Sequence, residues 1–152
     1  MLFVFSTKRE RIKLAPLILE AKKRMWPVYT CCTGGKKLRA TINKNEISFL
    51  VVHGQTRIAT KAVMAAFRSG IEVVHIEAGL PVARQKEINQ WVINHLTKWH
   101  FVASKNSERN LLAEGFRKEN IFLVENASPN SFAYAAKTII DTLANQTFLK
   151  IS

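Results

Sequence analysis

Short apolar runs alternate with helix-forming segments along the chain, and this alternation restricts the fold more than any other feature of the sequence. The runs are of strand length, and they occupy residues 2–6, 27–33, 47–54, 71–79, 100–104 and 121–126. A run without regular polar positions is typical of a strand buried on both faces, as in a parallel sheet. Apolar residues at helical spacing lie between most runs, over residues 9–24, 57–69, 84–98, 106–115 and 128–145.

This pattern predicts an α/β fold, a Rossmann-like doubly wound parallel sheet in three α/β/α layers. The chain has 152 residues, the size of one domain, so we assign residues 1–152 to a single domain. The connection over residues 33–47 is shortened. Parallel neighbours need a dozen or more linking residues, so we expect this segment to be too short for the usual crossover helix.

Three local features carry further expectations. Pro16 lies inside the first helical pattern and is expected to kink or loosen that helix. Asn106 or Ser107 is expected to cap the helix that follows the fifth run. Cys31 and Cys32 are adjacent, and a disulfide between them would be strained, so we expect free thiols.

Composition narrows the function classes. No apolar run approaches the roughly 20 residues of a membrane span, so no membrane partner is expected. Free thiols and the lack of a secretion-signal pattern favour a cytoplasmic location. The sequence has no CxxC pair and no third ligand beside His53 and His75, so we expect neither a metal site nor a cofactor.

The charge is uneven as well as high. The net charge is +12, and residues 1–50 hold eleven Lys and Arg against three Glu, a balance of +8, which leaves +4 for the remainder. Such a field favours a polyanion or a phosphorylated ligand. The alternative is a surface that serves only solubility.

Polar residues follow several of the predicted strands at their carboxyl ends, where open parallel sheets bind ligands. They occur at residues 6–10, 33–35, 53–56 and 75–79, and they include Glu77. No glycine-rich dinucleotide fingerprint or phosphate loop is present. Glu77 is therefore either part of an active site or a residue that only caps the following turn.

Five segments together resemble one family. LFVFSTKRERIKLAPLILEAKKR, LVVHGQT, VVHIEAGL, EIN and ASKNSERNLLAEGFRKENIFLVEN are similar, in order, to the amino-terminal half of the non-hydrolysing UDP-N-acetylglucosamine 2-epimerases. The resemblance implies one half of a GT-B pair of Rossmann-like domains, with the nucleotide sugar between the halves. It implies interconversion of UDP-GlcNAc and UDP-ManNAc, in which UDP is eliminated and then added back after a proton changes face at C2.

The resemblance also implies site residues. Glu77 and Glu87 match catalytic carboxylates. The residues expected to contact substrate are Lys8, Glu10, Lys13, His53 and Gln55.

This sequence departs from the family pattern at several of its positions. Gln55 replaces the aspartate of a His-Gly-Asp motif. Lys8 replaces an arginine, and Lys86 replaces the first of two glutamates. The residues at three further positions also differ from those of the family: Arg9, Pro81 and Gln90. The family has a longer region in place of residues 33–47 and a carboxyl-terminal domain that this chain does not match. Loss of one general acid or base costs about 10²- to 10⁴-fold, and substrate positioning contributes several powers of ten. We therefore expect a truncated epimerase-like domain that is inactive alone.

Three hypotheses remain open. The chain is an epimerase half that binds a UDP-sugar and acts with a companion subunit supplying the missing domain. Alternatively, it is a non-catalytic basic module for an acidic partner or nucleic acid. The third hypothesis is an oligomerisation module, with a homodimer as the expected form and Trp26, Trp91 and Trp99 as candidate contacts.

Overall fold

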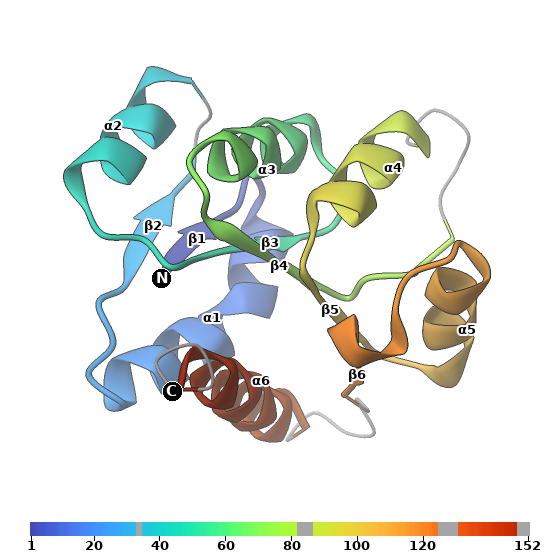
Figure 1. Ribbon diagram of the computed structural model, residues 1–152. Coiled ribbons are helices and arrows are strands. Elements are labelled where there is room, and N and C mark those ends of the chain that lie inside the picture. The colour runs from blue at the N-terminus through green and yellow to red at the C-terminus, as the bar shows by residue number, and fades with distance from the viewer. Residues whose placement is uncertain (33–34, 82–86, 125–130, 149–152) are drawn as a thin grey trace.

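The computed structural model describes residues 1–32, 35–81, 87–124 and 131–148, and these form a three-layer α/β/α domain (Figure 1). The described strands make a six-stranded sheet in the order β2-β1-β3-β4-β5-β6, with every neighbouring pair parallel. The strands are β1 (Leu2–Val4), β2 (Tyr29–Cys31), β3 (Phe49–His53), β4 (Glu72–Ile76), β5 (Trp99–Val102) and β6 (Ile121–Leu123). The predicted fold class is confirmed.

Helices cover both faces of this sheet. They are α1 (Lys8–Lys23), α2 (Lys36–Lys44), α3 (Arg57–Arg68), α4 (Glu87–Leu96), α5 (Lys105–Ala113) and α6 (Ser131–Phe148), with a short 3-10 helix η2 (Lys118–Asn120) before β6. Helices α1 and α6 lie side by side on one face, and α2, α3 and α4 lie on the other (Figure 1). The last helix therefore returns to the face where the first one lies.

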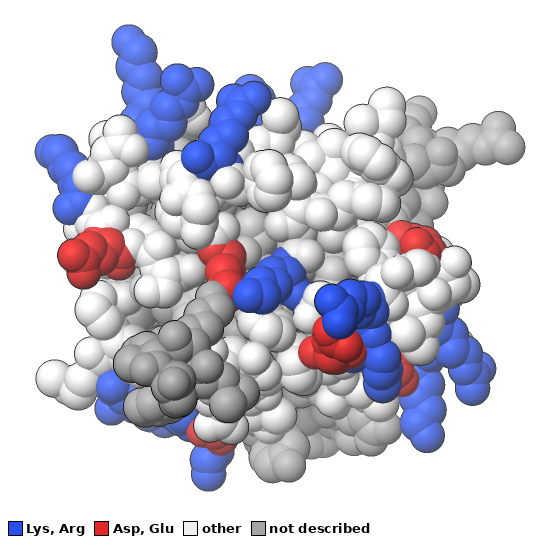
Figure 2. Space-filling view, viewed as in Figure 1, with Lys and Arg blue, Asp and Glu red and all other residues white. Residues whose placement is uncertain are grey.

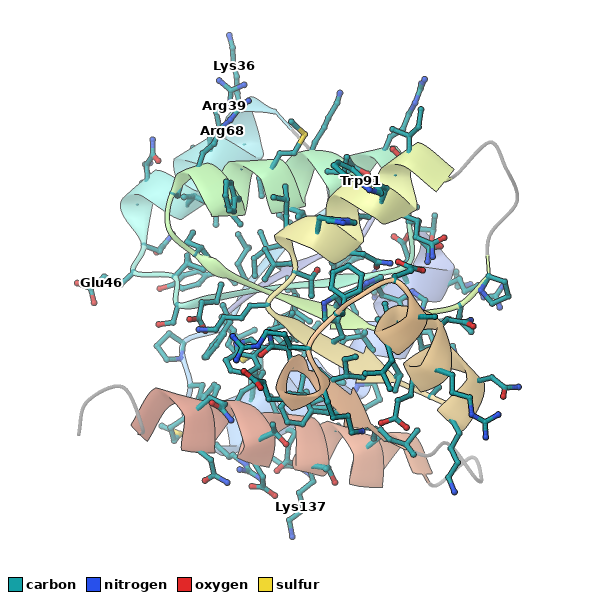
Figure 3. The ribbon with its side chains drawn as sticks, turned by 45° about the vertical axis from the view of Figure 1, so that its right-hand side comes forward. Lys36, Arg39, Glu46, Arg68, Trp91 and Lys137 are labelled. Carbon is teal, nitrogen blue, oxygen red and sulfur yellow. The ribbon has the colours of Figure 1, made fainter. Side chains whose placement is uncertain are left out.

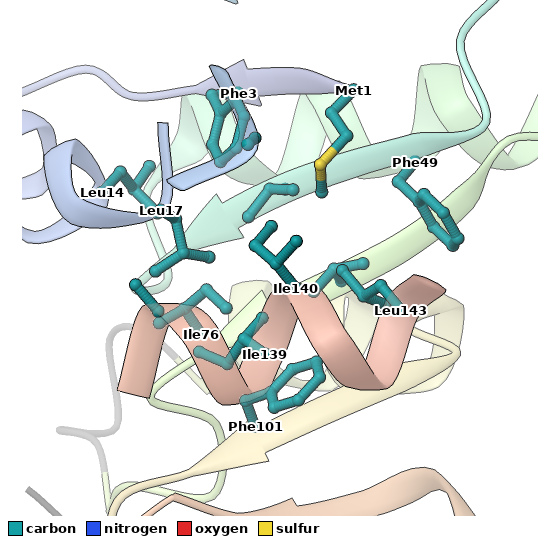
Figure 4. Packing of buried hydrophobic residues seen from close by; sticks show 14 of the residues in the cluster. Met1, Phe3, Leu14, Leu17, Phe49, Ile76, Phe101, Ile139, Ile140 and Leu143 are labelled. Atoms are coloured by element: carbon teal, nitrogen blue, oxygen red, sulfur yellow. The ribbon is translucent and has the colours of Figure 1, made fainter. Parts of the chain in front are cut away.

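Alternate residues of each strand pack against opposite helical layers. In β1, Phe3 packs with Leu14 and Leu17 of α1 and with Ile140 of α6, as Figure 4 shows. Its neighbours in the strand belong instead to the cluster that includes α2 and α3. Full burial of one such side chain stabilises the fold by about 1.5–3 kcal/mol, so burial on both faces explains the continuous apolar runs.

The expectation that residues 33–47 are too short for a crossover helix is wrong, because α2 occupies most of this connection. Leu38 and Ile42, four residues apart, lie on one side of α2 and are buried against the sheet. A nine-residue helix rises about 13 Å, which matches the length of a short strand, so a crossover helix fits between β2 and β3.

Helix α1 continues through Pro16 to Lys23. The local expectation for the start of α5 differs from the structure. Helix α5 is capped by Ser104, whose Oγ accepts a hydrogen bond from the Ser107 amide at 3.2 Å, so neither Asn106 nor Ser107 is the cap. The expectation of free thiols is confirmed, with Cys31 buried and Cys32 exposed. In the described part of the chain, no helix is both long and apolar enough to cross a membrane.

Candidate active site

The topology brings the predicted site residues to one edge of the sheet. β1 lies between β2 and β3, so the chain leaves β1 toward one side of the sheet and later continues from β3 toward the other. The carboxyl ends of strands on either side of such a switch in order form the usual ligand site of an open α/β sheet. The loop after β1, the end of β3 and the end of β4 all meet there (Figure 1).

Glu77 is held by two basic side chains from different elements. Its Oε1 lies 2.5 Å from Nζ of Lys13 in α1, and its Oε2 lies 3.0 Å from Nε2 of His53 at the end of β3. The Glu77 and His53 side chains are 16% and 11% exposed, so both are largely screened from solvent. The structure therefore joins three of the predicted residues, although they are up to 64 positions apart in the sequence.

The backbone at Glu77 turns sharply to place this carboxylate. β4 ends at Ile76, and Glu77 has φ 58°, a left-handed conformation that is uncommon outside glycine and costs of order 1 kcal/mol. Gly79 follows with φ 73°, and a Cβ atom there would lie 2.3 Å from the carbonyl oxygen of Ser107 in α5. Asn110 Nδ2 donates to the Gly79 carbonyl at 2.9 Å. Close packing against α5 thus fixes the turn that carries Glu77.

The environment keeps Glu77 ionised. The hydrogen bond from His53, together with that from Lys13 and against the opposing effect of burial, lowers the pKa of Glu77 to about 2. A carboxylate with so low a pKa is a weak general base at neutral pH. A carboxylate in this arrangement can orient the histidine beside it, as in a carboxylate–histidine pair. His53 Nδ1 is buried and has no hydrogen-bond partner among the described residues.

Glu10 fixes the first loop. It is only 6% exposed, and its Oε2 accepts hydrogen bonds from the Ser6 amide at 2.5 Å, the Ser6 hydroxyl at 3.0 Å and the Thr7 amide at 3.1 Å. Thr7 Oγ1 accepts from the Glu10 amide in return, which completes a capping box at the start of α1. Ser6 and Thr56 are 3.4 Å apart between their hydroxyl oxygens, and this contact joins the first loop to the start of α3.

The other predicted residues do not join the Glu77 cluster. Lys8 is exposed on the first turn of α1, and Gln55 is half-buried between β3 and α3. Glu87 is the first residue of α4, but its side chain lies outside the described residues, as does Lys86. In the described part of the chain, no group of His, Cys, Asp or Glu side chains could hold a metal ion.

A small hollow lies beside the cluster. It has a cavity volume of about 30 Å³, and Lys13, Glu77, Phe101 and Ala103 line it together with residues of α6 such as Ala135. Pockets for drug-sized ligands usually measure about 300–1,000 Å³, so this hollow is the floor of a site rather than a complete one. Sequence patterns did not single out Ala103 or Ala135, because small apolar residues carry no motif.

Comparisons with known proteins agree with this geometry. The family model described as UDP-N-acetylglucosamine 2-epimerase matches residues 27–150. The UDP-N-acetylglucosamine 2-epimerase of Campylobacter jejuni is 25% identical over 182 aligned positions, which cover 91% of this chain and 48% of the relative. The corresponding protein of Salmonella typhimurium (strain LT2) is 33% identical over 101 positions, which cover 62% of this chain and 27% of the relative.

Solved structures give the same result. The UDP-GlcNAc 2-epimerase from Neisseria meningitidis, solved bound to UDP-GlcNAc, superposes with a TM-score of 0.76 at 25% identity, over 98% of this chain and 52% of the other. The UDP-N-acetylglucosamine 2-epimerase from Rickettsia bellii shares the fold, with a TM-score of 0.77 at 21% identity, over 94% of this chain and 50% of the other.

The lengths of these matches show what part of the family the chain represents. It spans about half the length of the first curated relatives that it matches. The alignment with the Campylobacter jejuni protein has 182 positions, more than the 152 residues of this chain, so that relative has additional residues inside the matched region. With the family match over residues 27–150, these findings show that the chain belongs to the UDP-N-acetylglucosamine 2-epimerase family.

Proposed function

We propose that this domain forms one wall of a UDP-N-acetylglucosamine 2-epimerase site and is inactive without a complementary domain. Membership of the family supports the reaction type, and the Neisseria meningitidis relative is described as bound to UDP-GlcNAc. The chain spans about half of its first curated relatives, and the hollow beside Glu77 is small. A second wall must therefore enclose and orient the sugar.

The observation that carries this proposal is the position of Glu77. Its carboxylate stands at the switch in strand order, held by Lys13 at 2.5 Å and His53 at 3.0 Å. A buried turn with a left-handed residue at its start delivers it there. A carboxyl that only capped the turn would not need two basic partners from α1 and β3.

The proposed mechanism follows from the competition for Lys13. The diphosphate of the nucleotide sugar is a better partner for this ammonium than a single carboxylate, because it carries more negative charge. If Lys13 moves to the diphosphate, the pKa of Glu77 rises toward its ordinary range. With His53 hydrogen-bonded to it, Glu77 then removes the proton from C2 as the C1–O bond to UDP breaks, which leaves a C1–C2 double bond. A second carboxyl group protonates C2 on the opposite face as UDP adds back to C1, and exchange with water restores both carboxyl groups. We assign Glu87 as the second carboxylate, with Lys8 and Gln55 as substrate contacts.

Deuterium exchange tests the proposal. UDP-N-acetylglucosamine is incubated in D₂O with the purified domain, alone and with a separately produced carboxyl-terminal domain of the Neisseria meningitidis relative, and deuterium at C2 is read by NMR. We expect exchange only in the mixture and none with Glu77→Gln in place of the native chain. Exchange by the domain alone would disprove the need for a complementary domain. No exchange in any mixture would exclude the enzymatic function.

A homodimer is the assembly that we propose for the domain. Trp91 is 61% exposed and Ile88 is 79% exposed, and both lie on α4. Trp99, by contrast, is 5% exposed and Trp26 is only partly exposed, so these two side chains are poorly placed for contacts between copies. Light scattering of the native chain and of Trp91→Ser provides the test. A monomer at all concentrations would disprove the homodimer.

Binding of nucleic acid by a non-catalytic basic module is the second candidate function. The balance of +8 in residues 1–50 favours it. A salt titration with random duplex DNA provides the test, because phosphate contacts give a steep loss of affinity as salt rises. No binding at about 50 mM salt would exclude this function.

A further inference from the structure

The outer surfaces of α2 and α3 carry positive charge that their own acidic residues do not balance. Neither helix contains Asp or Glu. Their cations are Lys36, Lys37, Arg39, Lys44, Arg57, Lys61 and Arg68, and all are exposed. Over the described ranges, none of these seven side chains joins an ion pair. We call them the cationic rim.

The cationic rim is concentrated on one side of the molecule. Figure 2 shows Lys and Arg side chains projecting over the region of α2 and α3, with few acidic atoms among them. Lys36, Arg39 and Arg68 extend outward on the same side in Figure 3, and Lys137 of α6 points away from the opposite side. This separation makes the surface testable, because cations on α6 can serve as a matched control.

A groove with an apolar floor lies between the two helices. Its volume is about 460 Å³, within the range of ligand-binding clefts. The buried residues Leu38 and Ile42 of α2 lie at the bottom of the groove, and its exposed apolar surface comes from Met64 and Ala65 of α3. Arg39, Lys61 and Arg68 border it. The groove therefore combines apolar surface with cations from both helices.

Helix α3 presents different residues to the core and to the groove. Ala59, Ala62 and Ala66 of α3 are buried in the core, and the residues of α3 that border the groove are Lys61, Met64, Ala65 and Arg68. Met64 stays 38% exposed and Phe67 62% exposed. Apolar side chains thus remain at the surface beside cations that find no internal partner.

We propose that this groove binds an acidic amphipathic helix of a partner protein. Apolar side chains of that helix at positions i, i+3 or i+4 and i+7 would enter the groove, and its carboxylates would pair with the cationic rim. Both features are needed: the floor supplies buried apolar area, and the rim supplies charge complementarity and selects the partner. The proposal does not depend on epimerase activity.

Two other occupants fit the surface less well. A second copy of the chain would place one cationic rim against another, and like charges across an interface are unfavourable. Nucleic acid would satisfy the rim, but its phosphates would leave the exposed apolar surface of Met64 uncovered. An acidic amphipathic helix satisfies both the charge and the apolar floor.

Fluorescence anisotropy with defined probes tests this proposal. The main probe is a labelled peptide of about 18 residues, with Leu along one helical face and Glu on the others. The second probe has the same residues in an order that spreads Leu over all faces, and the third is duplex DNA of about 20 base pairs. We expect the first peptide to bind at least about tenfold more tightly than the second, with an affinity that falls as salt rises.

Variants localise the binding. Arg39→Glu with Arg68→Glu should weaken binding of the amphipathic peptide by about tenfold or more, and Met64→Gln should weaken it without changing the net charge. Lys22→Glu with Lys137→Glu makes the same change in net charge on α1 and α6 and should bind like the native chain. Circular dichroism confirms that each variant is folded.

The opposite results would overturn the proposal. Equal affinity for both peptides would mean that charge alone attracts them. Tighter binding of the duplex, lost in the Arg39→Glu, Arg68→Glu variant, would identify a nucleic-acid surface. Equal weakening by the control pair would show that no particular face is used. A change from dimer to monomer in the Arg39→Glu, Arg68→Glu variant would identify a contact between copies.

Discussion

At the scale of single residues, Glu77 has the most unusual combination of backbone conformation, contacts and pKa described above. It combines a left-handed backbone, two basic partners and a pKa lowered to about 2. Strain and a displaced pKa together are more typical of a functional group than of a turn cap. In the proposed mechanism, the diphosphate of the ligand releases this carboxylate from Lys13.

Glu77→Gln should lower the stability of the domain at neutral pH. The native pKa of Glu77 lies below its ordinary value of 4.5, so its contribution is fully present above pH 4.5 and is lost as the pH falls through about 2. We expect a loss of about 1–3 kcal/mol in the free energy of unfolding at pH 7, measured with urea. At pH 4 the ¹³C chemical shift of the Glu77 carboxyl should still be that of an ionised carboxylate. A carboxyl that titrates near 4.5 would contradict this prediction.

Gln55 offers a gain-of-function test at the same scale. The family resemblance places an aspartate at this position, and a glutamine amide cannot transfer a proton. In the mixture with a complementary domain, Gln55→Asp should therefore raise deuterium exchange at C2, by up to about 10²-fold. Gln146→Asp, which adds the same charge near the end of α6, is the control and should leave exchange unchanged. An unchanged rate with Gln55→Asp would show that position 55 takes no part in proton transfer.

At the scale of elements, the contact between the turn after β4 and helix α5 positions the site. A Cβ atom at Gly79 would overlap the Ser107 carbonyl, whereas one at Gly70 would meet nothing within 4 Å. The two glycines have nearly the same φ, 73° and 68°, so the pair separates the steric effect from the backbone effect. The difference in stability loss between an alanine at position 79 and one at position 70 therefore measures how tightly α5 holds the turn.

Gly79→Ala should be much more destabilising than Gly70→Ala. Gly70→Ala should lower the free energy of unfolding by about 1 kcal/mol, because an alanine is strained in the left-handed backbone conformation. Gly79→Ala must also displace α5, so it should lower the free energy of unfolding by about 2–4 kcal/mol. Urea unfolding of the three chains measures both values. Similar losses for the two variants would mean that α5 does not restrain the turn.

At the scale of the whole molecule, two buried histidines connect stability to pH. His75 and His100 pair in register on β4 and β5, and they are 0% and 1% exposed. Burial lowers the pKa of His75 to about 3, with the charges of His100 and His53 adding to the effect. Burial also lowers the pKa of His100 to about 4, with His95 adding to it. Both imidazoles are therefore neutral in the folded domain under ordinary conditions.

The domain should lose stability as the pH falls from about 6.5 toward 4. Over this interval the unfolded chain binds protons at these histidines, whose ordinary pKa is 6.5, and the folded chain does not. Because the contribution of Glu77 changes only below pH 4.5, the upper part of the interval reports the histidines. Urea unfolding at pH 7.5, 6 and 5 measures how the free energy of unfolding changes with pH, and His75→Met should flatten this slope. A flat native profile would contradict the prediction.

The sequence by itself determined the order of the strands, the parallel sheet and the position of Glu77 after the fourth strand. Apolar runs buried on both faces have a pattern that few other folds share, and VVHIEAGL places Glu77 directly after one of them. These features are local or nearly so. They depend on the period of apolar residues and on short motifs, which one-dimensional patterns contain.

Only the tertiary structure decided which side chains meet and which surfaces stay open. The contacts of Glu77 with Lys13 and His53 join positions far apart in the chain, and they follow from β1, β3 and β4 lying side by side. The helix α2 was missed because its two buried residues, Leu38 and Ile42, sit among cations that obscure the pattern. The groove between α2 and α3 likewise exists only where two separately encoded helices pack, because its shape depends on the distance between them.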